Sequence, residues 1–331
     1  MIKLMADSTC DLSQEVIEKY DIGVAPLTIT VEGNDYQDKI DMQPDEFYKL
    51  LGSLDTLPTT AMPSPQKFMN IIDDAIEQGY KEILCITMSS GTSGSYQSAK
   101  VAEEYFHETY TDPDLRIHVV DSKSMSHGSG YLILKSAILR EQGANFDELV
   151  SFNERYKRNV KHFLSVDDLD NLIKSGRLTN VSAMIGKVLK VKPIMSMRDG
   201  KGAIVAKVRG RKKVFQHYIQ EFKRRMDPEL TDFVIIGYTS DRLVAESLEL
   251  KLRSEADFQG DIYIMQMGAA VGTHVGLGGL SMFFIEKGHQ HDGLLHNEMQ
   301  QILDANKKLM KFMEKDELLK RFNEYKNKIM K

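Results

Sequence analysis

The segment ITMSSGTSGSYQSAK, residues 86–100, holds residues suited to binding an anion. It begins in the apolar run 82–87 and leads into the helix-like sequence SYQSAKVAEEYF at 95–106. Hydroxyl groups and free backbone N–H groups at the start of a helix stabilise a small negative charge, because the helix dipole is positive there. The loop therefore predicts a site for a carboxylate or a phosphate. A purely structural turn is the alternative.

Two enzymatic interpretations of this loop fail on spacing. A nucleotide P-loop requires G-x-x-x-x-G-K-[ST], and no Lys follows Gly91 or Gly94 at that distance. A serine hydrolase elbow requires G-x-S-x-G, whereas Gly91-Thr-Ser-Gly-Ser95 brings the second glycine one position too early. The pattern favours holding an anion over transforming it.

Three other loops carry polar groups. LPTTAMPSP at 57–65 places two Thr residues before a helix start that proline sets. DSTCDL at 7–12 follows an apolar run, but it lacks the D-x-D pair of metal-assisted phosphatases, which favours a loop-bracing role for Asp7. The glycine-dense stretch 268–279 surrounds His274, where the backbone can approach a ligand closely and the imidazole can donate to an anion. A structural histidine is the alternative there.

Charged residues outside these loops give weaker signals. Arg177 and Arg209 lie near turns, where most arginines are simply solvated. His289, His291 and His296 invite a metal site, but no pattern of Cys or carboxylate ligands supports one. Solvated histidines are the better interpretation.

The whole composition is that of a globular protein without a nucleic-acid surface. The 331 residues carry a net charge of −5, with 42% hydrophobic and 27% charged residues. The N-terminal MIKLMADSTCDL has no stretch resembling a signal peptide, and no window is apolar enough for a membrane span. The two cysteines, Cys10 and Cys85, end apolar runs and are expected to be buried thiols in a reducing cytosol. We therefore expect a cytoplasmic protein.

Short apolar runs alternate with helical patterns, which predicts an α/β fold with mainly parallel sheets. The length favours two domains, 1–158 and 159–285. Strands are expected at 2–6, 24–31, 82–87, 116–120, 162–166, 192–197, 203–208, 233–238 and 261–267, and helices at 65–78, 95–106, 130–141, 146–159, 211–226 and 241–254. A helical extension, 286–331, follows; its segment 297–331 is amphipathic with mixed charge, which suits packing on the body or a partner protein.

The order and spacing of these motifs resemble the DegV family over roughly residues 1–285. The matching segments are DSTCDL at 7–12, PTTAMPSP at 58–65, ITMSSGTSGSYQSA at 86–99, VVDSKSMSHGSG at 119–130, LDNLIKSGRLTNVSAMIGKVLKVKPIM at 169–195, VRGRKK at 208–213 and GTHVGLGGL at 272–280.

The resemblance implies a bacterial two-domain α/β protein that binds a long-chain fatty acid, such as palmitate, stearate or oleate, between its domains. It implies a carrier without catalytic residues or cofactor, which presents the acid to a separate ATP-binding fatty acid kinase subunit for acyl phosphate formation. Carried over by motif, Thr60 and Ser93, with Gly94 beside it, would bind the carboxylate together with His274. Arg177 and Arg209 would flank the pocket mouth where the kinase docks.

Three positions depart from the family pattern: Ala61-Met62 stands where Ser-Gln is usual, Thr92 where Leu is frequent, and Leu277 where Pro is usual. The first removes polar groups beside Thr60, so pocket shape or ligand choice is expected to differ. Two other functions fit the residues. One is a serine-dependent acyl hydrolase using Ser93 and His274, and the other is a lipid sensor that signals to a partner through the C-terminal helix.

Overall fold

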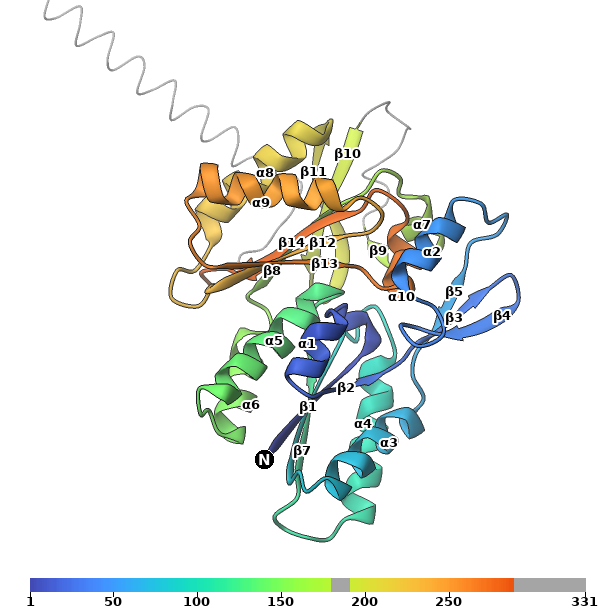
Figure 1. The fold of residues 1–331 in the computed structure, drawn as a ribbon, viewed down its shortest axis with the longest axis vertical. Coiled ribbons are helices and arrows are strands. Elements are labelled where there is room, and N and C mark those ends of the chain that lie inside the picture. Colours follow the sequence, from blue (N-terminus) through green and yellow to red (C-terminus); the bar gives the residue numbers. More distant parts are fainter. Residues whose placement is uncertain (180–190, 289–331) are drawn as a thin grey trace, which may run out of the picture. The chain divides into compact units, whose positions relative to one another are not determined.

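The computed structural model describes residues 1–179 and 191–288 of the chain (Figure 1). These residues belong to one compact unit, Met1–His291. Residues 289–331 of the predicted extension, with the three histidines between 289 and 296, lie outside the described residues, as does 180–190 of the family-like segment.

A parallel four-stranded sheet forms the N-terminal half, in the order β2-β1-β6-β7. Its strands are β1 (Ile2–Asp7), β2 (Ile22–Ala25), β6 (Glu82–Thr87) and β7 (Arg116–Asp121). Five helices flank it: α1 (Gln14–Lys19), α3 (Pro65–Glu77), α4 (Ser95–Thr109), α5 (His127–Glu141) and α6 (Phe146–Tyr156). Figure 1 shows α3 and α4 on one face and α1, α5 and α6 on the other. With both faces covered, every residue of β1 is buried, including the charged Lys3 and Asp7 at either side of its apolar centre.

The prediction of a single strand at 24–31 is wrong, because this segment belongs to two separate strands. The chain leaves the parallel sheet after β2 because Pro26 has no N–H to continue a ladder. It re-enters as β3 (Thr28–Val31), which pairs antiparallel with β4 (Asn34–Gln37) and β5 (Thr59–Ala61) in a separate three-stranded sheet. Helix α2 (Pro44–Leu51) connects β4 to β5. This small sheet is what carries Thr60.

The second large sheet has seven strands, in the order β13-β12-β14-β8-β10-β11-β9. They are β8 (Val160–Ser165), β9 (Leu178–Thr179), β10 (Val191–Arg198), β11 (Lys201–Arg209), β12 (Phe233–Tyr238), β13 (Asp261–Gln266) and β14 (Leu280–Ile285). The associated helices are α7 (Asp170–Lys174), α8 (Arg211–Arg225), α9 (Arg242–Ala256) and α10 (Ala269–Val275). The α/β class is confirmed, but this sheet is mixed: β12–β13 and β11–β9 are parallel, and its other pairs are antiparallel.

The antiparallel pair β10–β11 has a local cause. Asp199 and Gly200 have φ of 51° and 77°, the left-handed geometry of a two-residue hairpin, and they join β10 directly to β11. An Asp-Gly pair between apolar runs signals this turn in sequence. The central strand β14 was not predicted, although its sequence LSMFFI is a buried apolar run.

Helix α5 lies between the two large sheets (Figure 1). Residues 127–137 are buried all round, and one hydrophobic core joins them to Leu4 of β1, Phe233 of β12 and Phe283 of β14. Tyr131 Oη donates to the carbonyl of Phe233 at 3.0 Å. The chain passes from the first sheet to the second between α6 and β8; the domain limits 1–158 and 159–285 remain a prediction, because one core spans both sheets.

Candidate functional site

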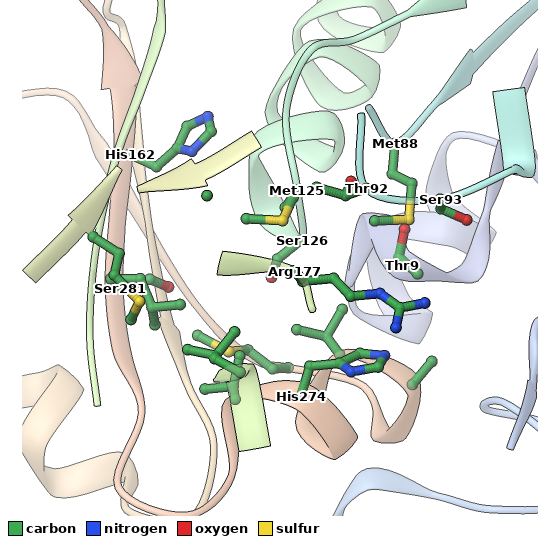
Figure 2. Close-up of a pocket in the computed structure, with 18 of the residues that line it drawn as sticks. Thr9, Met88, Thr92, Ser93, Met125, Ser126, His162, Arg177, His274 and Ser281 are labelled. Carbon is green, nitrogen blue, oxygen red and sulfur yellow. The ribbon is translucent and has the colours of Figure 1, made fainter. Parts of the chain in front are cut away.

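A cavity of about 230 Å³ is lined by residues of the three-stranded and seven-stranded sheets, of α10, and of the segments that follow β1, β2, β6 and β7 (Figure 2). Its wall is mostly apolar and includes five methionines. The lining residues that matter below are Thr9, Thr60, Met62, Met88, Ser93, Gly94, Met125, Ser126, His162, Leu164, Arg177, Met195, Ser196, Met267, His274, Ser281 and Phe283. Such a wall suits an elongated apolar ligand that carries few polar groups.

The hydroxyl-rich loop predicted at 86–94 forms part of this wall. Ser93 lies just before α4, and its Oγ contacts Ser95 Oγ at 3.0 Å and accepts from Ser95 N at 3.2 Å. Gly94 is the N-cap residue of α4, and no side chain caps that helix. A Cβ at Gly94 would lie 2.2 Å from Met62 Sδ, so glycine allows the thioether to pack here. The loop thus brings a serine and a helix N-terminus to the cavity.

The same loop is held by the hairpin of the second sheet. Ser89 Oγ donates to the carbonyl of Gly200 at 2.6 Å. A Cβ at Gly91 would lie 2.5 Å from that carbonyl oxygen, so the two backbones approach as closely as glycine permits. The position of Ser93 therefore depends on contact between the two halves of the unit.

Thr60 and His274 meet although they are 214 positions apart. Thr60 Oγ1 lies 2.9 Å from His274 Nε2, one group coming from β5 and the other from α10. His274 Nδ1 is buried and has no hydrogen-bond partner within the described residues. Burial, followed by the charge of Arg177, lowers the pKa of His274 to about 4, so the imidazole is neutral at neutral pH.

Arg177 lies at the cavity, immediately before β9, and is partly buried. Its Nη1 donates to the carbonyl of Ser175. In Figure 2 its guanidinium points toward the side of the view on which Thr9, Ser93 and His274 lie. A cation placed here stabilises a bound carboxylate.

Two buried carboxylates fix the start of α10, the helix that carries His274. Asp38 Oδ1 accepts from the N–H groups of Ala269 at 3.1 Å and Ala270 at 3.3 Å. Asp11 Oδ1 accepts from Gly268 N at 2.7 Å. Burial raises the pKa of both carboxyls, that of Asp11 to about 7. Through these bonds the two acids hold the backbone from which α10 begins.

Asp7 braces the first loop, as the sequence indicated. Its Oδ1 accepts from the backbone and hydroxyl of Thr9, and its Oδ2 accepts from Met88 N at 2.9 Å. Burial raises the pKa of Asp7 as well. Because Thr9 and Met88 line the cavity, this carboxylate joins two of its wall segments.

The structure brings Thr60, Ser93, Gly94, Arg177 and His274 to one cavity. Arg209, by contrast, lies exposed at the end of β11 and is not part of the lining. The roles assigned to all six residues remain predictions. Both cysteines are buried free thiols, as expected.

Sequence reasoning missed most of the cavity wall. Thr9, Ser126, His162, Ser196 and Ser281 line it, and none was singled out as a site residue. Ser281 is the one polar residue of the apolar strand segment LSMFFI, a signal that could have been noticed. Which face of a strand meets a cavity, however, follows from the sheet order, which the sequence did not reveal.

The geometry does not place a serine nucleophile beside a base. Within the described residues, the hydrogen-bonding neighbour of the Ser93 side chain is Ser95, whereas His274 Nε2 is engaged by Thr60. Activation of a serine requires a base within hydrogen-bond reach of its hydroxyl. The arrangement supplies neutral donors and a cation, which can orient a carboxylate.

None of the helices in residues 1–179 and 191–288 is long and apolar enough to cross a membrane. No group of three or more His, Cys, Asp or Glu side chains in residues 1–179 and 191–288 is placed to hold a metal ion.

Comparison with known proteins gives consistent matches over the same part of the chain. The family model that matches is DegV, described as a family of uncharacterised proteins, and it spans residues 1–287. A DegV domain-containing protein of Clostridium acetobutylicum is 36% identical over 288 residues, covering 86% of this chain and 99% of the relative. A DegV domain-containing protein of Staphylococcus aureus is 32% identical, covering 86% of this chain and 97% of the relative.

Solved structures give the same result. A fatty-acid-binding DegV family protein from Thermus thermophilus superposes with a TM-score of 0.77 at 26% identity, covering 86% of this chain and 99% of that chain. A stearic acid-binding protein from Eubacterium ventriosum also gives a TM-score of 0.77, at 28% identity, covering 87% of this chain and 99% of that chain.

Proposed function

The chain belongs to the DegV family, and from this premise we propose that it binds a long-chain fatty acid in the cavity and presents the carboxylate to an ATP-dependent kinase subunit. Palmitate, stearate and oleate are the expected ligand class. The observation that carries the proposal is a largely apolar cavity to which Ser93, Thr60 and His274 all contribute. Fatty-acid binding by the similar proteins described above supports it.

The free energy of binding has two sources, the alkyl chain of the ligand and its carboxylate head group. Burying each methylene contributes about 0.8 kcal/mol, so about fifteen of them give roughly 10 kcal/mol before the costs of association. Each hydrogen bond from a hydroxyl to the carboxylate adds about 1.5–3 kcal/mol in gross terms. The alkyl chain therefore supplies most of the affinity, whereas Thr60, Ser93 and His274 fix the orientation.

A carrier role fits the chemistry of these groups. Neutral hydroxyls, a neutral imidazole and the Arg177 guanidinium stabilise a carboxylate without attacking it. We assign phosphoryl transfer to a separate subunit, with Arg177 and Arg209 at the docking side. No catalytic residue and no cofactor are needed in this chain under the proposal.

The direct test is native mass spectrometry of the protein purified from a bacterial host. We expect an adduct with the mass of a long-chain fatty acid, which denaturation releases. Delipidated protein should then rebind stearate in a titration. A chain that neither carries nor rebinds any long-chain acid would overturn the proposal.

The kinase step is tested separately with Ser93→Ala. We expect this variant to keep bound lipid but to support little acyl phosphate formation with a cognate kinase subunit, because the carboxylate loses an orienting donor. Full turnover would contradict the role of Ser93. Covalent labelling of Ser93 by a serine-reactive probe would instead support an acyl hydrolase.

A further inference from the structure

We propose that Met62 is a site of oxidative modification that regulates ligand binding. A peroxide converts its thioether to the sulfoxide, and the sulfoxide competes with the carboxylate of a fatty acid at the start of α4. Methionine sulfoxide reductases reverse such a change. This inference rests on the proposed function, because it concerns the regulation of the same head-group site.

Met62 is the methionine of the cavity lining that solvent reaches most easily. Its side chain borders the cavity and is 52% exposed, so it lies where the cavity meets solvent. The four other methionines of the lining are shielded: the exposed fraction is 8% for Met88, 3% for Met195 and 1% for Met267, and Met125 is partly buried. A dissolved peroxide must touch the sulfur atom to oxidise it, so Met62 is expected to react first.

The contacts of Met62 hold its sulfur beside the predicted head-group residues. Thr60 lies two residues earlier in the chain, and both side chains border the cavity. The carbonyl of Pro63 accepts a hydrogen bond from Ser98 Oγ of α4 at 2.5 Å, which ties this segment to the helix. A Cβ at Gly94 would overlap Met62 Sδ, so the sulfur lies directly against the N-cap residue of α4.

The modification is an oxygen transfer to sulfur. A lone pair of the Met62 sulfur attacks one oxygen of hydrogen peroxide, so that an S–O bond forms and the O–O bond breaks. The proton on the transferred oxygen passes to the departing hydroxide, which leaves as water. Sulfur is oxidised by two electrons and the peroxide is reduced by two. The product is a polar sulfoxide in place of an apolar thioether.

A sulfoxide at this position competes with a carboxylate for the same donors. Its oxygen accepts hydrogen bonds, but the group has no donor to offer in return. The first N–H groups of α4 have no partner within the helix, and no side chain caps it, so they and the Ser93 hydroxyl are the donors nearest to Gly94. The close contact with Gly94 leaves no room for the added oxygen on that side. The oxygen therefore enters the head-group site, or the side chain leaves the cavity lining, and both outcomes weaken binding.

The experiment treats delipidated full-length protein with dilute hydrogen peroxide and follows each methionine by peptide mass spectrometry. We expect Met62 to gain one oxygen atom before Met88 and Met267 do. Stearate binding is measured before and after treatment by displacement of a fluorescent fatty acid. Oxidation should raise the dissociation constant at least about 10-fold, the loss of one hydrogen bond to a charged group. Treatment with methionine sulfoxide reductases should restore the original value.

Met62→Leu assigns the effect to one residue, because leucine is apolar, similar in size and free of sulfur. Its dissociation constant for stearate, whatever the starting value, should not change on peroxide treatment, although every other methionine is retained. Met226→Leu is the matched control, since Met226 is partly buried and does not line the cavity. This control should keep the full sensitivity to peroxide.

Failure of the inference can be told apart from failure of the proposed function. If the untreated protein binds stearate and the protein oxidised at Met62 binds it equally well, the inference is overturned and the proposed function stands. Oxidation of Met88 or Met267 before Met62 would overturn the inference too, as would a Met62→Leu variant that peroxide still weakens. If the untreated, delipidated protein binds no long-chain acid, the proposed function fails together with the inference.

Discussion

Replacing Thr60 with valine tests the head-group site most directly. Valine keeps the branched shape of threonine and removes only the hydroxyl, so it leaves no cavity behind. In the structure that hydroxyl lies 2.9 Å from His274 Nε2, at the cavity. The variant therefore removes one predicted donor to the carboxylate and one partner of the imidazole.

The expected loss follows from the kind of hydrogen bond. A hydrogen bond to a charged group is worth about 1.5–3 kcal/mol, so Thr60→Val should weaken stearate binding about 10- to 150-fold. In the unliganded protein the same change removes a neutral hydrogen bond, worth about 1 kcal/mol net. The free energy of unfolding should therefore fall much less than the free energy of binding.

The assay is displacement of a fluorescent fatty acid by stearate, with the unfolding midpoint measured in parallel. Thr59→Val is the control, because Thr59 is the preceding residue of β5 and its side chain is exposed on the other face of the strand. If Thr60→Val and Thr59→Val bind stearate alike, to within about twofold, Thr60 is not a head-group ligand.

Three further predictions concern pH and stability. The pKa of His274 is about 4 in the folded protein, below its ordinary 6.5, so the free energy of unfolding is unaffected above pH 6.5 and falls by up to about 3 kcal/mol as the pH drops toward 4. In chemical unfolding experiments, His274→Asn should lose less stability than the wild type over this pH range. Parallel pH profiles of the two proteins would refute this prediction. Gly91→Ala should lower the free energy of unfolding by about 1–3 kcal/mol, because the added Cβ would lie 2.5 Å from a backbone carbonyl oxygen. Gly52→Ala is the control and should lower it far less, because its Cβ would lie 3.7 Å from the nearest atom. Equal unfolding midpoints for the two variants would count against the close approach at Gly91. Arg225→Met should lower the free energy of unfolding by about 3–5 kcal/mol, because it removes the guanidinium that pairs with the buried Glu286 at 2.9 Å. Adding Glu286→Leu should restore most of the lost stability. A double variant no more stable than the single one would contradict the pairing.

Local patterns in the sequence were enough to find several elements of the site. The run 82–87 followed by glycines and hydroxyls predicted a strand, a loop and a helix start, and these are β6, the Ser93 loop and α4. The cap and proline at 64–65 predicted the start of α3. Each of these features depends on residues a few positions apart, so each is readable from the chain alone.

The strands around 24–31 and 280–285 show where local reading stops. Pro26 ends β2 and β3 then forms a hairpin with β4, but the other partner of β3 is β5, which follows only after helix α2. LSMFFI at 280–285 is an apolar run like many others, and only its antiparallel pairing with β8 and β12 makes it a central strand. Sheet order, which depends on these distant pairings, was therefore not predicted.

The sequence by itself determined the α/β class, the hydroxyl loop at a helix start and the family resemblance, from which carboxylate-binding roles for Thr60, Ser93 and His274 are proposed. Only the tertiary structure decided that Thr60 and His274 meet, that Asp11 and Asp38 hold the helix bearing His274, and that His162 and Ser281 lie on one face of the second sheet, at the cavity. The physical reason is the distance along the chain over which the interacting residues are separated. Capping, turns and hydrophobic periodicity are set by neighbours within about a turn or a strand, whereas a cavity is enclosed by side chains whose only common property is their position in the folded chain.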